Sequence, residues 1–245
     1  MIQASGGGEL VGGGDHRDAD AGERMSEKID YEVLRKLLDE GAQLVEVLPR
    51  EEYAEEHLPG AINIPLKELD RDSATRLDRE LPVIVYCWDR LCDMSPRAAA
   101  LLDRLGFERV YDYAASKVDY LARGLPREGE KAGERRAVDA LRKDVVRSAP
   151  GDSVEEARGR IEASAFGFGL VVDENGVLLG RLRGSALKES EDGAVEQLME
   201  VGPSTVRADV PAAELRERLE KRELSYTIVT TPDGVLLGVV QRSDL

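Results

Sequence analysis

The segment VIVYCWDRLCDMSPRAAALLDRLGF, residues 83–107, constrains the fold most because it joins a buried strand to a helix through one short loop. Residues 83–86 are β-branched or aromatic, which is typical of a strand buried on both faces of a parallel sheet. Ser95 and Pro96 suit the start of a helix, and an apolar face follows until Gly106. We therefore predict a parallel sheet flanked by helices, with ligand sites beyond the carboxyl ends of its strands.

Both cysteines of the chain, Cys87 and Cys92, lie in this loop. Cys87 ends the strand and faces the amino end of the helix, where unpaired backbone N–H groups favour an anion. We expect this position to lower the pKa of the Cys87 thiol. Arg90 and Arg97 are candidates to add positive charge there, and Asp89 and Asp93 oppose them. The alternatives are that Cys87 is a small buried apolar side chain, or that it forms a transient disulfide with Cys92.

The composition argues against several classes of protein. A formal net charge of -15 in 245 residues disfavours nucleic acid or an anionic membrane surface as a partner, since phosphate binding needs clustered lysines and arginines. No stretch approaches the roughly 20 apolar residues of a membrane span, and the N-terminus lacks the pattern of a signal peptide. The only histidines, His16 and His57, have no neighbouring ligands. We expect a cytoplasmic protein without a metal site.

The first half of the chain alternates helices and strands. Residues 1–24 are rich in glycine and aspartate and are predicted to be disordered, so Met1 and Met25 are alternative starts. The predicted elements are a helix at 31–41, a strand at 42–48, a short helix at 51–57, a strand at 61–65, a strand at 108–113 and a helix at 118–124. Together with residues 83–107 they form a predicted α/β domain over 25–127. Residues 128–140 are charged and are predicted to be a linker running into a helix.

The second half contains an internal repeat. The stretch VDENGVLLGRLRGSAL (172–187) recurs as TTPDGVLLGVVQRSDL (230–245), with GVLLG identical in both copies. Each copy predicts a hairpin whose turn ends in glycine, and each follows an amphipathic helix. Such paired units commonly bury each other's apolar faces. We predict an α+β domain over 141–245, with repeats at about 141–190 and 196–245.

Residues 26–127 resemble the rhodanese-like family. The matching stretches are LVEVLPREEYAEEHLPGAINIPL (44–66), VIVYC, SPRAAALLDRLGF and YAASKVDYLARGLP (113–126). The resemblance implies a loop cysteine that takes a sulfane sulfur from a donor such as thiosulfate or a persulfide and passes it to a thiol acceptor. By position that cysteine is Cys87. Its candidate substrate-binding neighbours are Trp88, Arg90, Cys92 and Arg97.

The loop departs from the usual family pattern and is interpreted as a longer subtype. Five positions after Cys87 stands Cys92, where many members carry arginine. The usual Asp-x-Arg at the end of the second strand begins here with Glu46 and lacks the arginine. The usual Gly-Gly ahead of Lys117 is replaced by alanine and Ser116. Lys117 lies on a loop within reach of the site, and the alternative is an ordinary solvent-exposed lysine.

Residues 141–245 resemble a tandem pair of cystathionine-β-synthase (CBS) domains. The resemblance implies regulation of the attached domain, an adenosine nucleotide (AMP, ADP or ATP) between the repeats, and a homodimer through the pair. The candidate nucleotide-binding residues are Thr205, Thr227 and Asp244, of which Asp244 would hold ribose hydroxyls. Sulfur transfer itself implies no cofactor.

Three functions follow from these patterns. The leading one is a sulfurtransferase or persulfide carrier that uses the Cys87 thiolate and has a regulatory CBS pair. The alternative is a non-catalytic sensor that binds an adenosine nucleotide through the pair. A cysteine phosphatase or arsenate reductase is less favoured, because Arg97 comes too late after Cys87 to complete the phosphatase pattern.

Overall fold

The strand β4 (Val83–Tyr86) lies at the centre of the first sheet and is buried along its whole length. The computed structural model describes residues 26–188 and 193–245, so the predicted disordered tail and both alternative starts lie outside the described residues. Five parallel strands stand in the order β1-β5-β4-β2-β3. The other strands are β1 (Glu27–Ile29), β2 (Gln43–Glu46), β3 (Ile62–Asn63) and β5 (Val110–Tyr113). The predicted parallel α/β sheet is confirmed.

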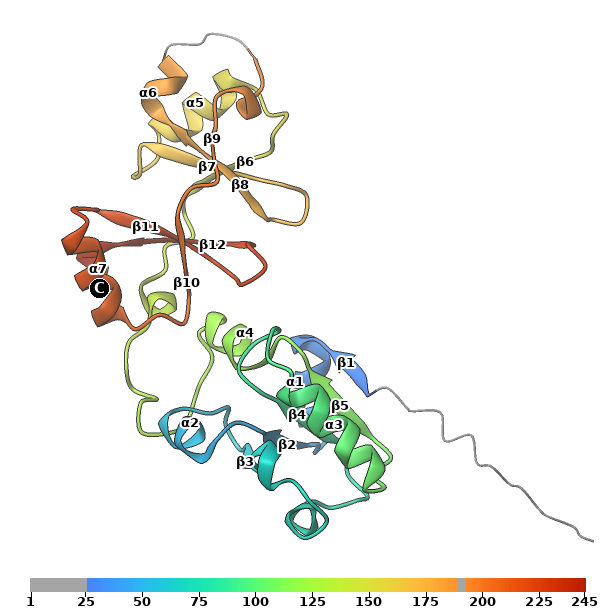
Figure 1. Ribbon diagram of the computed structural model, residues 1–245. Helices are drawn as coiled ribbons and strands as arrows, with labels where there is room; N and C mark the ends of the chain where they lie inside the picture. The colour runs from blue at the N-terminus through green and yellow to red at the C-terminus, as the bar shows by residue number, and fades with distance from the viewer. Residues whose placement is uncertain (1–25, 189–192) are drawn as a thin grey trace, which may run out of the picture.

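Helices cover both faces of this sheet (Figure 1). They are α1 (Tyr31–Asp39), α2 (Arg50–Glu55), α3 (Met94–Arg104) and α4 (Ser116–Ala122), with short 3-10 helices at Leu66–Glu68 and Ser73–Arg76. Successive side chains of a strand point to opposite faces. Accordingly Val83 and Val85 pack with α3, whereas Ile84 and Tyr86 pack with α1. This two-sided burial explains the unbroken apolar run of β4.

The helix α3 starts differently from its prediction. It begins at Met94, and Asp93 rather than Ser95 occupies the N-cap position. Ser95 lies inside the helix with a buried side chain. Pro96 is still tolerated because the N–H groups of a first helical turn have no partner within the helix. The capping role is wrong because the Ser95 hydroxyl is directed to Cys87 instead.

The second half forms two smaller sheets, one for each repeat. The first contains β6 (Val146–Ser148), α5 (Val154–Glu162), β7 (Phe168–Val172), β8 (Leu178–Arg183), α6 (Gly184–Lys188), a 3-10 helix at Val195–Gln197, and β9 (Glu200–Val201). The second contains β10 (Thr205–Arg207), α7 (Ala212–Lys221), β11 (Tyr226–Thr230), β12 (Leu236–Gln241), and a 3-10 helix at Arg242–Asp244. Both predicted hairpins are confirmed as antiparallel pairs, β7 with β8 and β11 with β12.

The two copies of GVLLG contact each other at the hairpin tips. The Leu178 N–H donates to the Gly234 carbonyl at 2.9 Å, and the Leu236 N–H donates to the Gly176 carbonyl at 2.9 Å. Side chains from both hairpins share one apolar cluster. The expectation that the repeats bury each other's apolar faces is therefore confirmed.

The sheet of each repeat also pairs with the segment that precedes the other repeat. Arg142, ahead of the first repeat, exchanges backbone hydrogen bonds with Val239 of β12. The strand β9, ahead of β10, pairs with β8 of the first repeat. Gly238 permits the first crossing, because a Cβ atom there would lie 2.2 Å from the Arg142 carbonyl oxygen. The repeats are thus intertwined rather than sequential.

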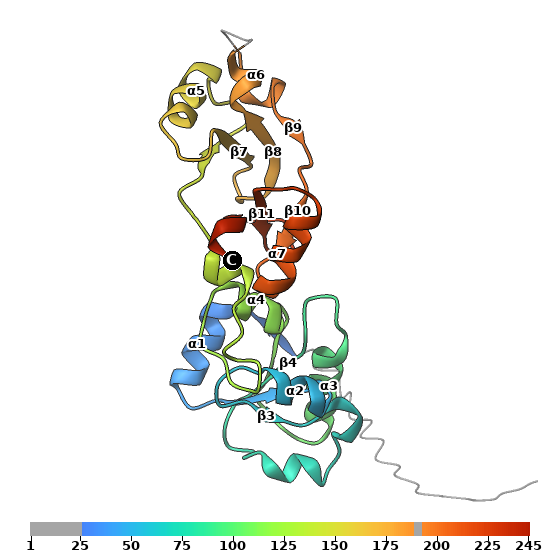
Figure 2. The same cartoon turned by 90° about the vertical axis from the view of Figure 1, so that its left-hand side faces the viewer.

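The three units are stacked along one long axis, and the second repeat lies between the first domain and the first repeat (Figures 1 and 2). The predicted linker is packed against both of its neighbours. Glu130 and Lys131 hydrogen-bond through their N–H groups to the carbonyls of Ala54 and Glu55. The 3-10 helix at Ala137–Ala140 enters the apolar core of the second repeat. Within the described residues, no helix is both long and apolar enough to cross a membrane.

Candidate functional site

The thiol of Cys87 lies at the carboxyl end of β4 and is completely buried. Its Sγ atom is 3.3 Å from Ser95 Oγ, 3.6 Å from the Cys92 carbonyl oxygen and 3.7 Å from Ser116 Oγ. Burial raises the pKa of the Cys87 thiol, and the hydrogen bond to Ser95 offsets only part of that rise. The expectation of a lowered pKa is wrong for this closed arrangement, because desolvation of the thiolate outweighs the helix terminus.

Ser116 holds the backbone beside this thiol. Its hydroxyl accepts the Cys87 N–H at 3.1 Å and donates to the Tyr113 carbonyl at 2.9 Å. Its φ of 58° lies in the left-handed region that favours glycine. This backbone conformation explains why the family pattern has glycine here. The serine side chain supplies the hydrogen bonds that offset the conformational cost.

The predicted neighbours of Cys87 contact different parts of the structure. Trp88 packs against the core beside Cys87, and its ring lies 5.6 Å from the Lys117 Nζ atom. Cys92 is partly buried, is not in a disulfide, and presents its backbone carbonyl to the Cys87 thiol. Arg90 instead forms an ion pair with Asp233 of the second repeat. The structure therefore brings backbone and core groups to the thiol and directs the Arg90 charge elsewhere.

Arg97 pairs with Asp93 at 3.3 Å and lines a separate cavity. This cavity, of about 730 Å³, lies between the start of α3 and the segments that follow β2 and β3. Its lining is largely apolar and includes Val47, Leu66, Met94 and Leu101, with Lys67 and Arg104 at its border. Arg97 thus faces a basic, partly apolar hollow that adjoins the first turn of α3.

Lys117 is buried rather than solvated, which excludes the alternative of an exposed side chain. Only 1% of its surface is exposed. Its Nζ atom lies 2.8 Å from Glu46 Oε1 and also donates to the Glu56 backbone carbonyl. The ammonium group of Lys117 therefore neutralises the Glu46 carboxylate at the end of β2. Sequence reasoning missed this pair because the two residues are 71 positions apart.

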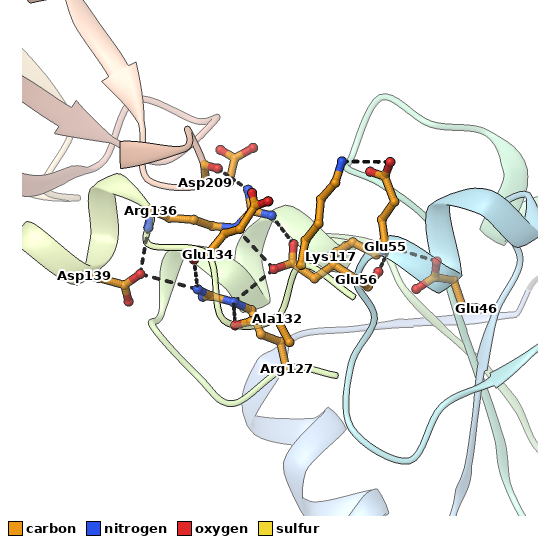
Figure 3. Close-up of polar contacts among 11 residues, drawn as sticks. Glu46, Glu55, Glu56, Lys117, Arg127, Ala132, Glu134, Arg136, Asp139 and Asp209 are labelled. Atoms are coloured by element: carbon orange, nitrogen blue, oxygen red, sulfur yellow. Dashed lines mark hydrogen bonds and ion pairs between the residues drawn. The ribbon is translucent and has the colours of Figure 1, made fainter. Parts of the chain in front are cut away.

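A second buried ion cluster joins the first domain to the second repeat (Figure 3). Arg127 Nε lies 3.0 Å from Glu56 Oε1, and Arg136 also pairs with the Glu56 carboxylate. A further N–H of Arg136 donates to the Asp209 carbonyl, close to the start of α7. Arg136 of the predicted linker and the preceding Arg127 therefore contribute to the interface between the first domain and the second repeat. The sequence signal for this role was the pair of arginines at 135–136, within a stretch that otherwise reads as solvated.

The predicted nucleotide-binding residues lie on β10, on β11 and in the 3-10 helix that follows β12. Asp244 pairs with Arg142 at 2.8 Å. Thr205 is exposed on β10, whereas Thr227 lines a cavity of about 300 Å³ with Arg181 and Tyr226.

A larger cavity of about 550 Å³ lies between the repeats. Phe166 and Tyr226 border it from different repeats, and Arg216 and Arg242 bring positive charge. In the part of the chain that the structure describes, no group of three or more histidine, cysteine, aspartate or glutamate side chains could hold a metal ion.

Comparison with protein families identifies two parts of the chain. The family model of the rhodanese-like domain matches residues 30–122, and that of the CBS domain matches residues 195–245. Both resemblances are therefore confirmed. The first repeat has the hairpin and helix arrangement of the second, although the CBS match covers only the second.

Two curated proteins are related to part of the chain. The HTH-type transcriptional regulator Rv0324 of Mycobacterium tuberculosis is 39% identical over 77 residues, which make up 31% of this chain and 34% of the regulator. The thiosulfate sulfurtransferase PspE of Escherichia coli is 39% identical over 67 residues, which make up 27% of this chain and 62% of that enzyme. This chain therefore spans less than two thirds of the length of either relative.

Among solved structures, the solution structure of the rhodanese-like domain from the Anabaena sp. Alr3790 protein is 25% identical. The match covers 45% of this chain and 85% of that domain, with a TM-score of 0.40.

Proposed function

Because the chain contains a rhodanese-like domain over residues 30–122 and a CBS domain over residues 195–245, we propose that it carries or transfers sulfane sulfur on Cys87. The observation that supports this most is the position of Cys87, the residue that joins the carboxyl end of β4 to the loop before α3 within the matched domain. The proposed role of the CBS pair is regulatory.

The proposed reaction has two steps. The Cys87 thiolate attacks the outer sulfur of thiosulfate, so that a cysteine–sulfur bond forms, the sulfur–sulfur bond of the donor breaks, and sulfite leaves with the bonding electrons. A nucleophilic acceptor, such as a thiolate or cyanide, then attacks the outer sulfur of the persulfide. That second attack releases the Cys87 thiolate. The proton of the resting thiol goes to solvent before the first step.

The groups around the thiol suit a bound persulfide anion. The hydroxyl of Ser95 lies within reach of the sulfur, and the first turn of α3 directs N–H groups toward the same end of β4. Hydrogen bonds and a helix terminus both stabilise an anion. These groups would therefore stabilise a negatively charged persulfide on Cys87 more than the neutral thiol of the closed arrangement.

The hollow beside α3 supports an anionic donor. Lys67, Arg97 and Arg104 border it, while the chain as a whole carries a net charge of -15. A local basic border in an acidic protein attracts anions that the rest of the surface repels. Thiosulfate is an anion of this kind, and the hollow adjoins the turn that carries Ser95 and Arg97.

Cyanolysis tests this function. Wild-type protein loaded with thiosulfate is expected to form thiocyanate on addition of cyanide, and Cys87→Ser is expected to form none. Thermal unfolding of both proteins checks that the substitution leaves the fold intact. Equal thiocyanate from the two proteins, or none from the wild type, would contradict the proposed role of Cys87.

A second candidate function is binding of an adenosine nucleotide between the repeats. The cavity that Phe166 and Tyr226 border offers aromatic faces for a base, and Arg216 and Arg242 offer charges for phosphates. Calorimetry with AMP, ADP and ATP tests it. We expect Tyr226→Ala to weaken binding, whereas Asp244→Ala should have little effect, since Asp244 is paired with Arg142. Loss of binding in Asp244→Ala alone would point to the site inferred from the family pattern.

A further inference from the structure

Two ion pairs tie the loop that follows Cys87 to the second repeat. Arg207 Nη1 lies 3.5 Å from Asp89 Oδ2, and Arg90 Nη2 lies 3.3 Å from Asp233 Oδ2. Arg207 ends β10, whereas Asp233 lies in the turn between β11 and β12. Two separate elements of one repeat therefore contact consecutive residues of the loop.

Asp89 also determines the shape of this loop. Its Oδ1 atom accepts the N–H groups of Leu91 at 3.0 Å and Cys92 at 3.2 Å, while its Oδ2 atom meets Arg207. Its backbone carbonyl oxygen is 3.8 Å from the Cys87 Sγ atom. One side chain thus links the second repeat to the backbone that covers the thiol.

The thiol is inaccessible while this arrangement holds. Cys87 is completely buried, although Leu91 in the same loop is 87% exposed. A donor can reach Cys87 only after the loop moves. Access to the thiol must therefore depend on contacts that hold the loop in place.

The two ion pairs are suited to a reversible contact. The side chains of Arg207, Arg90 and Asp233 are about half exposed, at 44%, 59% and 52%, whereas that of Asp89 is 15% exposed. Ion pairs this exposed are weak and are screened by salt. The buried contact of Arg136 with Glu56 joins the same two units independently, so the repeat would stay attached when the loop is released.

The turn that carries Asp233 is also sensitive to the arrangement of the two repeats. Gly234, the next residue, accepts a hydrogen bond from Leu178 of the first repeat. A shift between the hairpin tips would therefore displace Asp233 relative to Arg90. A ligand can cause that shift only if it binds one arrangement of the repeats better than the other.

We propose that the second repeat acts as a latch that holds the Cys87 loop closed through the Asp89–Arg207 and Arg90–Asp233 ion pairs. Release of the latch exposes the thiol. This inference rests on the proposed function in taking Cys87 as the reactive group, and it adds the means by which access to that group is controlled.

The alkylation rate of Cys87 by iodoacetamide tests the latch. Peptide mass spectrometry scores Cys87 and Cys92 separately in the full chain. In the double variant Arg207→Gln, Asp233→Asn, the Cys87 rate is expected to rise about fivefold or more, as loss of two weak ion pairs allows. The matched control is Arg183→Gln, which breaks a half-exposed pair with Glu200 in the first repeat and should change the rate less than about twofold.

Salt dependence provides a second measurement. Raising ionic strength should speed Cys87 alkylation in the wild type and have much less effect in the double variant, because the screened pairs are already absent. An unchanged rate in the double variant, or equal salt dependence in both proteins, would overturn the latch.

Thiocyanate formation by the same proteins separates the latch from the proposed function. Faster alkylation without any thiocyanate would support the latch and contradict sulfur transfer. Thiocyanate formation with an unchanged alkylation rate would support sulfur transfer and contradict the latch.

Discussion

The Nζ atom of Lys117 lies 2.8 Å from the Glu46 carboxylate, and both side chains are at most 1% exposed. Burial raises the pKa of Glu46, and the charge of Lys117 counteracts that rise. The pair joins the start of α4 to the end of β2. It therefore connects two of the segments that surround the Cys87 loop, and each partner depends on the other for charge balance.

Lys117→Met is expected to destabilise the protein strongly. Removing the ammonium leaves the Glu46 carboxylate buried without its partner, which costs about 3–5 kcal/mol in unfolding free energy. Urea unfolding followed by circular dichroism measures this loss. Lys131→Met is the matched control, because Lys131 forms an exposed pair with Glu55 and its loss should cost at most about 1 kcal/mol. Equal losses in the two variants would contradict the buried role of Lys117.

The raised pKa of Cys87 predicts a pH dependence. Because burial favours the neutral thiol, its stabilising contribution is present below the ordinary pKa of 9.0 and is lost as pH rises through the higher value in the folded protein. The alkylation rate of Cys87 should therefore reach half of its plateau at a higher pH in the folded protein than in urea. Iodoacetamide labelling across pH measures both midpoints, and a lower midpoint in the folded protein would contradict the desolvated thiol.

Gly238→Ala is expected to disturb the backbone pairing of the Arg142 segment with β12 of the second repeat. The new Cβ atom would lie 2.2 Å from the Arg142 carbonyl oxygen, so the crossing segment must shift at a cost of about 1–3 kcal/mol or more. Gly133→Ala is the control, because no atom lies within 4 Å of a Cβ atom there. Thermal unfolding should show a lowered midpoint for Gly238→Ala alone, and matching midpoints would argue against the close crossing.

Local patterns predicted much of the fold. The apolar run of β4 and the face of α3 were sufficient to place the parallel sheet, and the GVLLG repeat predicted both hairpins. The strand β1 was missed because it has only three residues, of which Ile29 alone is buried. The exchanged edges were missed because nothing in the residues around Arg142 records that they pair with β12.

The site was predictable in its centre and not in its surroundings. The loop position identified Cys87, but Ser95 looked like a helix cap and Lys117 like a solvated side chain. Ser95 is instead directed to the Cys87 thiol, and Lys117 is directed to Glu46, which lies 71 positions away in the sequence. A single sequence likewise suggests that Arg90 adds charge at the thiol, whereas its partner Asp233 belongs to the other half of the chain.

The most direct test of the account is whether Cys87 bears a persulfide. Purified protein incubated with thiosulfate and freed of excess donor is analysed by intact mass and by fragmentation, which distinguishes Cys87 from Cys92. We expect a mass increase of one sulfur atom, located on Cys87 and absent in Cys87→Ser. A protein that gains no sulfur, or gains it only elsewhere, would contradict the assignment of Cys87 as the sulfur carrier.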